Sequence, residues 1–339
     1  MVDFLVQLLN IPSPTGDTDR AMAFVQEAFA PYVQLEMSPK GLLAGTIAGE
    51  RSDAPRALTA HVDTLGAMVS SIKPNGRLAM TRLGGWVWNS VEGEGVRVFT
   101  SDGRTYRGSI VPTAASAHAH SADDLTAKRT DANMEIRLDE RVPTSYSVLQ
   151  LGIQVGDFVA MDPRVELSDS GFIRSRHLDD KAGVATMLGA IQALHAAGQR
   201  PLQDTTIHIS NYEEVGHGAA TGFPANLAEL ISIDMAVVAP AQQSDEFSVT
   251  ICAKDSAGPY HSGLRRRLEK LAREGHIAHR TDIYPNYSSD GEAYWKAGGN
   301  VAMALVGPGV DASHHYERTH REALDNTARL LAAYLVSEK

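Results

Sequence analysis

Two adjacent glutamates, Glu213 and Glu214, follow the apolar run 207–210 and precede Val215-Gly216. This setting is typical of a strand end, where burial and mutual repulsion would raise the pKa of one carboxyl. One glutamate could bind a metal ion while its neighbour moves protons. We assign Glu214 to the metal and Glu213 to general-base catalysis. A glycosidase pair is the alternative, but its acids lie about 5–9 Å apart across a sugar, which adjacent residues fit less naturally.

A histidine and an aspartate, His61 and Asp63, close a second strand-like run, 57–60. Side chains two residues apart on a strand project to the same side. A metal-bound imidazole usually has its other ring nitrogen held by a carboxylate or a carbonyl group. We therefore expect His61 to bind metal and Asp63 to orient it, although the motif alone also fits a buried histidine beside a turn aspartate.

Two neighbouring aspartates, Asp179 and Asp180, precede a pattern of apolar residues at helical spacing over 184–194. Acids at a helix start can simply cap it. A carboxylate at this point could also bridge two metal ions roughly 3.5–4 Å apart, because it offers an oxygen to each. The spacing alone leaves open which of the two aspartates would bridge.

Further candidate ligands lie in the last third of the chain. Asp234 interrupts the apolar run 230–238, and a buried carboxylate needs a cation, an arginine or a metal as partner. The segment 313–322 contains three histidines before the last predicted helix. We expect His320, directly before that helix, to complete a second metal site, with His314 and His315 as competing candidates.

The elements that must position these residues alternate between strands and helices. Two helical patterns lead in, strands follow at 43–48 and 57–60, and strand and helix signals then alternate from residue 164 to the end. Between them, residues 65–163 hold short β-like runs split by glycine, proline, aspartate and asparagine. We predict an α/β fold with a mainly parallel sheet and flanking helices, formed by 1–64 and 164–339, and a small inserted β-barrel-like domain.

Composition excludes several classes of protein. The 339 residues carry a net charge of −10, and the dense basic cluster, 265–267, is followed by Glu269 in a predicted helix, so we expect no nucleic-acid partner. No window is apolar enough to span a bilayer, and the N-terminus has no signal-peptide pattern, so we predict a cytoplasmic protein without a membrane partner. The single cysteine, Cys252, lies in an apolar run and is expected to be a buried thiol.

The order of these motifs resembles the M42 metallopeptidase family, within the wider clan of M20- and M28-type aminopeptidases. The resemblance rests on His-x-Asp, Asp-Asp-Lys-x-Gly, Glu-Glu-Val-Gly, an apolar strand with aspartate and a late histidine, with the lead-in Leu8–Gly16 and an insertion after the first ligand. It implies a phosphorylase/hydrolase-like aminopeptidase fold. It also implies His61 and Asp234 on one metal, Glu214 and His320 on the other, Asp179 bridging and Glu213 as base.

The resemblance further implies that the chain removes N-terminal residues from peptides with two zinc ions, or cobalt or manganese, per subunit. It implies a homo-oligomer, a dimer or larger, assembled through the inserted domain, which could also act as a lid. Two alternatives stay open: an amidohydrolase or deacylase of an N-acylated amino acid or small modified peptide, and a metal-binding assembly protein without catalytic activity.

Overall fold

The computed structural model describes residues 1–338, which divide into two compact units. We call residues 1–64 with residues 164 onward the sheet unit, and Leu65–Pro163 the barrel unit. Lys339, the last residue of the expected discontinuous domain, lies outside the described residues. None of the described helices has the length and apolar character needed to span a bilayer.

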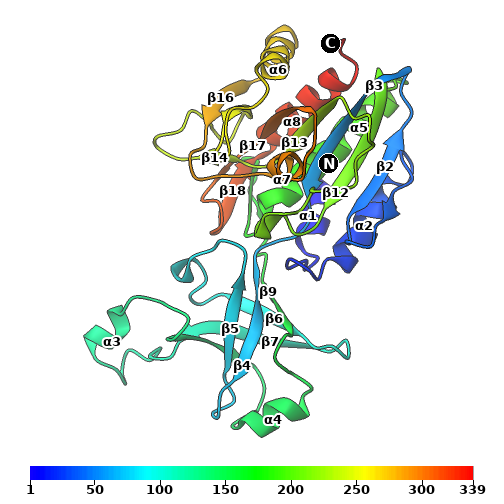
Figure 1. The fold of residues 1–339 in the computed structure, drawn as a ribbon. Helices are drawn as coiled ribbons and strands as arrows, with labels where there is room; N and C mark the ends of the chain where they lie inside the picture. Colours follow the sequence, from blue (N-terminus) through cyan, green and yellow to red (C-terminus); the bar gives the residue numbers. More distant parts are fainter. Residues whose placement is uncertain (339) are drawn as a thin grey trace. The chain divides into compact units, whose positions relative to one another are not determined.

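The sheet unit is built on one large mixed sheet (Figure 1). Its main strand order is β1-β2-β12-β3-β13-β17-β18-β11-β10; β14 and β15 also pair with β17, and β16 pairs with β15. The strands are β1 (Glu36–Met37), β2 (Leu43–Ile47), β3 (Arg51–His61), β10 (Glu166–Leu167), β11 (Phe172–Ser175), β12 (Gln203–Ser210), β13 (Glu229–Ile233), β14 (Ala236–Val238), β15 (Val249–Lys254), β16 (His279–Ile283), β17 (Ala302–Asp311) and β18 (Glu317–His320).

The central strands β12, β3, β13 and β17 run parallel to one another. Helices cover the sheet because alternate side chains of each buried strand must be removed from water on both faces. The helices are α1 (Val2–Leu9), α2 (Asp19–Phe29), α5 (Leu178–Ala196), α6 (Ser262–Glu274), α7 (Asp290–Lys296) and α8 (Arg321–Leu335). Leu58 and Ile231 pack with α2, α5, α6 and α8, whereas Ala57 and Leu230 pack in a separate cluster with residues near α7.

The barrel unit is a closed antiparallel barrel in the order β4-β5-β8-β7-β6-β9. Its elements are β4 (Gly66–Ile72), β5 (Leu78–Leu83), the 3-10 turn η1 (Trp88–Ser90), β6 (Gly95–Phe99), β7 (Thr105–Pro112), α3 (Ala122–Thr126), β8 (Met134–Leu138), α4 (Ser145–Gln150) and β9 (Phe158–Met161). A separate apolar core fills it, with Trp86, Val98 and Ile136 among its fully buried members. The predicted α/β class with an inserted barrel is confirmed.

Candidate active site

The candidate residues gather at the carboxyl ends of neighbouring parallel strands. His61 is the last residue of β3, and Asp234 follows the end of β13. Glu213 and Glu214 follow β12 in the 3-10 turn η2 (Glu213–Val215). Because the carboxyl ends of parallel strands meet at one edge of a sheet, side chains far apart in the sequence lie close together here, as in other open α/β sheets.

His61 is fully buried and held at both ring nitrogens. Its Nδ1 donates to the main-chain carbonyl oxygen of Asp63 at 2.9 Å, and its Nε2 lies 3.1 Å from Oδ1 of Asp179. The Asp63 carboxylate is farther from this ring, with Oδ1 at 3.6 Å from Nδ1. Asp63 thus contacts the His61 ring as expected, through its main-chain carbonyl group and not through its carboxylate.

The Asp63 carboxylate instead holds the turn that carries the two glutamates. Its Oδ1 accepts from the backbone N–H of Glu213 at 3.2 Å, and its Oδ2 accepts from that of Glu214 at 3.4 Å. The hydroxyl of Thr15 donates to the same Oδ2 at 2.8 Å. Tyr212, the residue before the turn, has φ of 72°, a left-handed conformation that is costly without glycine. These hydrogen bonds fix the backbone of both glutamates.

The carboxylate of Asp179 faces two different histidines. Its Oδ1 lies 3.1 Å from Nε2 of His61, and its Oδ2 lies 3.4 Å from Nε2 of His314. Asp180 follows through a cis peptide bond, and both aspartates have non-helical backbone angles before the regular part of α5. One Asp180 oxygen accepts from the backbone N–H of Gly183 at 3.1 Å. Asp180 therefore caps the helix, whereas Asp179 lies between the two rings.

Two groups of side chains offer ligand atoms close enough for a metal ion. We call His61, Asp180 and Asp234 the inner group, and Asp179, Glu214 and His314 the outer group; within each, the ligand atoms lie within 4.8 Å of one another. Oδ2 of Asp180 and Oε1 of Glu214 are buried and have no hydrogen-bond partner among the described residues. Because an unpaired buried carboxylate oxygen is costly, these orphaned atoms fit a bound cation at each group.

The late histidine in this cluster is His314, and His320 lies elsewhere. His320 caps α8, accepting at Nδ1 from the backbone N–H of Glu322, 3.2 Å away, and donating from Nε2 to the carbonyl oxygen of Ser170 at 2.8 Å. Both of its ring nitrogens are therefore used. His315 is exposed and belongs to neither ligand group. The structure thus places His314, and not the expected His320, beside the other candidate ligands, and which histidine binds metal stays a prediction.

Glu317, at the start of β18, is a fully buried residue that the sequence analysis missed. Its Oε2 accepts from the backbone N–H of Asp179 at 3.1 Å, and its Oε1 accepts from that of His314 at 3.0 Å. One carboxylate thus ties together two segments that supply the outer group. His314 has φ of 63°, so its conformation also needs such support. The spacing of three residues from His314 could have suggested this link.

Lys40 and Asp290 were also missed, and both hold the loop after the glutamate turn. Lys40 donates from Nζ to the carbonyl oxygen of Gly218 at 2.8 Å, and Oδ1 of Asp290 accepts from the backbone N–H of Ala219 at 2.8 Å. A Cβ at Gly218 would lie 2.1 Å from that Asp290 oxygen, so only glycine permits this approach. Neither residue belongs to a recognisable motif, so sequence alone offered no signal.

Several carboxylates are buried close together in the candidate active site, and this crowding shifts their pKa values. Burial, together with neighbouring carboxylates, raises the pKa of Glu213, Glu214 and Asp234 well above its usual range. Burial would lower the pKa of His314, but the hydrogen bond to Asp179 and nearby negative charges outweigh it and raise the pKa to about 10. Bound cations would relieve this repulsion.

Comparisons with known proteins agree with this geometry. The family model for M42 glutamyl aminopeptidase matches residues 41–330. The chain belongs to the M42 family. A putative aminopeptidase of Bacillus subtilis, YhfE, is 44% identical over 337 residues, which cover 99% of this chain and 97% of the relative. The glutamyl aminopeptidase of Lactococcus lactis is 30% identical over 186 residues, or 54% of this chain and 51% of the relative.

Solved structures share the fold at lower identity. An aminopeptidase from the archaeon Desulfurococcus kamchatkensis superposes with a TM-score of 0.89 at 21% identity, covering 100% of this chain and 95% of that one. The TET1 peptidase of Pyrococcus horikoshii gives a TM-score of 0.87 at 19% identity, with 99% of each chain covered, and that peptidase can assemble into a tetrahedron or a large octahedral shell. The expected M42 membership is confirmed, and this chain is an aminopeptidase of that metal-dependent family.

Proposed function

We propose that the chain removes N-terminal residues from peptides at a centre of two divalent metal ions. Asp179 supports this proposal most directly, because its two carboxylate oxygens face His61 and His314, which belong to separate ligand groups. A carboxylate with this arrangement suits a bridge between two ions. We assign His61 and Asp234 to one ion, with Asp180 beside them, and Glu214 and His314 to the other.

The ions, when bound, would polarise the scissile carbonyl and lower the pKa of the attacking water. The chain itself supplies the proton transfer. Glu213 belongs to neither ligand group, and its Oε2 lies 3.8 Å from Nε2 of His61, beside the place where the groups meet. From there the carboxylate can take a proton from the attacking water and return it to the leaving amine. Asp63 holds the Glu213 backbone still during this transfer.

Substitution of the proposed base tests the mechanism. Glu213→Gln keeps the shape of the side chain but cannot accept a proton, so kcat should fall by about 10²–10⁴-fold. The metal content, measured by inductively coupled plasma mass spectrometry, should stay at two ions per subunit in both proteins. Full turnover by Glu213→Gln with both ions bound would contradict the proposed role and favour a protein that only binds metal.

Substrates with and without a free amine test the reaction class. The enzyme should cleave aminoacyl p-nitroanilides and reject their N-acetylated counterparts, and chelation should abolish cleavage. Preference for the acetylated compounds would instead support a deacylase. Zinc is the metal we expect, with cobalt or manganese as alternatives, because the groups combine imidazole nitrogen with carboxylate oxygen. Activity that survives complete metal removal would contradict the two-metal proposal.

Assembly and location remain predictions. The structurally similar TET1 peptidase assembles into shells, which supports a homo-oligomer of this chain. We propose that the barrel unit takes part in that assembly, and that the protein acts in the cytoplasm. Light scattering of the purified protein gives the subunit number, and deletion of the barrel unit should reduce it.

A further inference from the structure

One pair of neighbouring strands in the barrel unit, β5 and β8, is only weakly paired. Strands β5 and β8 share a single pair of residues, Leu78 with Ile136, whereas the other neighbouring strands of the barrel share three or more. An ion pair holds the two strands together near this pair of residues, since Nζ of Lys73 lies 2.8 Å from Oε2 of Glu135. Beyond this pair the two strands separate. The barrel is therefore closed at one end of the joint and open along the rest.

The open part exposes a strand edge. Antiparallel continuation from Leu78 and Ile136 would set residues 79–83 opposite residues 131–135, but no such pairing exists among the described residues. Residues 79–83 pair with β4 on their other side. Their outward backbone groups therefore have no partner strand. We call the space between residues 79–83 and residues 131–135 the open seam.

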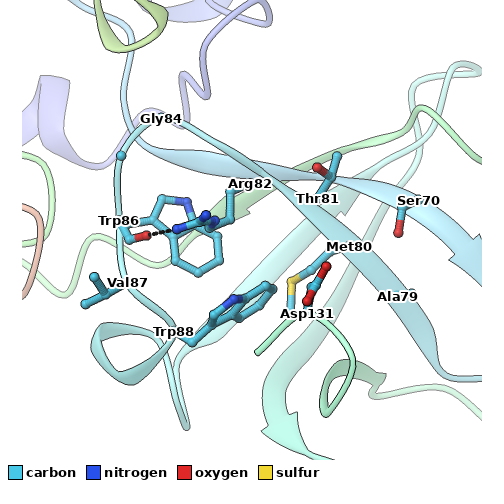
Figure 2. Close-up of a pocket in the computed structure, with 11 residues that line it drawn as sticks. Ser70, Ala79, Met80, Thr81, Arg82, Gly84, Trp86, Val87, Trp88 and Asp131 are labelled. Carbon is cyan, nitrogen blue, oxygen red and sulfur yellow. Dashed lines mark hydrogen bonds between the residues drawn. The ribbon is translucent and has the colours of Figure 1, made fainter. Parts of the chain in front are cut away.

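A pocket of about 710 Å³, a volume in the usual range for binding sites, lies on the β5 side of the open seam, and Asp131 lines it from the facing segment (Figure 2). Four consecutive β5 residues, Ala79 to Arg82, line it. Consecutive side chains of a strand point to opposite faces, so a pocket that touches all four runs along the backbone edge. Trp88 supplies an apolar, partly exposed wall, and its ring packs edge-on against the fully buried Trp86 ring, with centroids 4.9 Å apart at 82°.

The two charged side chains that line the pocket, Arg82 and Asp131, differ in whether other groups of the protein already contact them. Arg82 is already engaged, since it donates from Nη1 to the carbonyl oxygen of Trp86 at 2.7 Å and its guanidinium lies 5.8 Å from the Trp86 ring centroid. Asp131 lines the same pocket and is exposed, and it has no ion pair or hydrogen bond to another side chain among residues 1–338. Arg82 keeps its charge but is held against Trp86, whereas the Asp131 carboxylate is left for a ligand to contact.

We propose that the open seam binds an extended peptide, which adds a strand to β5 beside the Trp88 ring and places a basic group near Asp131. An unpaired strand edge recognises an extended chain through main-chain hydrogen bonds, and neighbouring pockets select side chains. The aminopeptidase meets such chains as substrates, which favours a peptide over a folded partner. This site is additional to the metal centre and does not depend on the mechanism proposed for it.

The test measures fluorescence anisotropy with a six-residue peptide that is acetylated at its N-terminus, labelled with fluorescein and made of alternating valine and threonine with one lysine and one phenylalanine. The whole protein should bind it saturably. The same peptide with N-methyl groups on alternate amides cannot pair with a strand edge, so its affinity should fall at least about tenfold. No saturable binding of the first peptide, or equal binding of both, would overturn the proposal.

Variants then locate the bound peptide. Trp88→Ala should weaken binding by about tenfold, because aromatic anchors dominate such contacts, and Asp131→Asn should weaken it by about threefold. Tyr146→Ala is the matched control, because Tyr146 is 69% exposed on α4 and does not line the pocket, so binding should be unchanged. If Trp88→Ala and Asp131→Asn bind like wild type, the peptide lies elsewhere. If they alter only the subunit number in light scattering, the seam is a contact between copies; either result overturns the proposal.

Discussion

The two ligand groups of the candidate active site differ in how they are enclosed. The inner group, His61, Asp180 and Asp234, is at most 4% exposed and comes from the ends of β3 and β13 and the start of α5. The outer group includes His314, whose side chain is 35% exposed and which lies in the loop between β17 and β18. The inner group is thus set by the sheet, whereas the outer group depends on a loop that Glu317 holds.

This difference in exposure predicts that the inner and outer groups have separate roles. A buried site excludes water and strengthens electrostatic interactions, so the inner group should hold its ion more firmly. The outer group has the open side, where a substrate amine could approach. Substitution of the residue that links the groups, or of one ligand alone, therefore tests whether the two groups bind their ions separately.

The largest effect is expected from Asp179→Asn, because Asp179 is the residue that faces both groups. Loss of the negative bridge should reduce kcat by about a thousandfold, since metal ions supply several kcal/mol of transition-state stabilisation. Mass spectrometry of metals should find fewer than two ions per subunit. The control is Asp17→Asn, at a residue whose side chain is 28% exposed in an ion pair on the surface. Two tightly bound ions in Asp179→Asn would show that the groups are independent.

The next largest effect separates two late histidines. His314→Ala should lose the outer ion and at least about tenfold in metal affinity, because a ligand matters no less than the residues that orient it. His320→Ala should keep both ions and lose about 1 kcal/mol of unfolding free energy, since it removes a helix cap. Metal titration and thermal unfolding of both variants show which histidine binds the outer ion and which one caps the helix. Loss of the outer ion in His320→Ala alone would restore the original expectation.

The same two histidines show which features of the site could be predicted from the sequence and which could not. Strand ends, the acidic pair and the helix after Asp180 follow from local patterns of apolar spacing and charge, so the sheet and most of the candidate ligands were predictable. The choice between His314 and His320 was not, because it depends on the path of a loop closed by long-range hydrogen bonds from Glu317. Likewise, the role of Asp63 depends on Thr15 and Glu213, which lie far from it in the sequence.

A smaller effect is expected from Glu317→Gln, which probes how the loop supports the outer group. Glutamine can replace only one of the two accepting oxygens that hold the backbones of Asp179 and His314. Metal affinity or activity should fall by about 10–100-fold, as for other residues that orient ligands, with the outer ion lost first. Glu322→Gln is the matched control, because that side chain is 64% exposed. Equal weakening of both ions would mean that Glu317 supports the whole site.

The smallest effect concerns Thr15, which acts on the site only through Asp63. Thr15→Val keeps the shape but removes the hydroxyl that donates to Oδ2 of Asp63 at 2.8 Å, while the two backbone N–H donors remain. One lost hydrogen bond is worth about 1 kcal/mol, so kcat should fall about fivefold with metal content unchanged. Thr15→Ser restores the donor and should restore kcat. If Thr15→Ser were as slow as Thr15→Val, packing of the methyl group would matter in place of the hydrogen bond. Loss of an ion in Thr15→Val would mean that Asp63 also controls the ligand groups, and the inner group could no longer be regarded as set by the sheet alone.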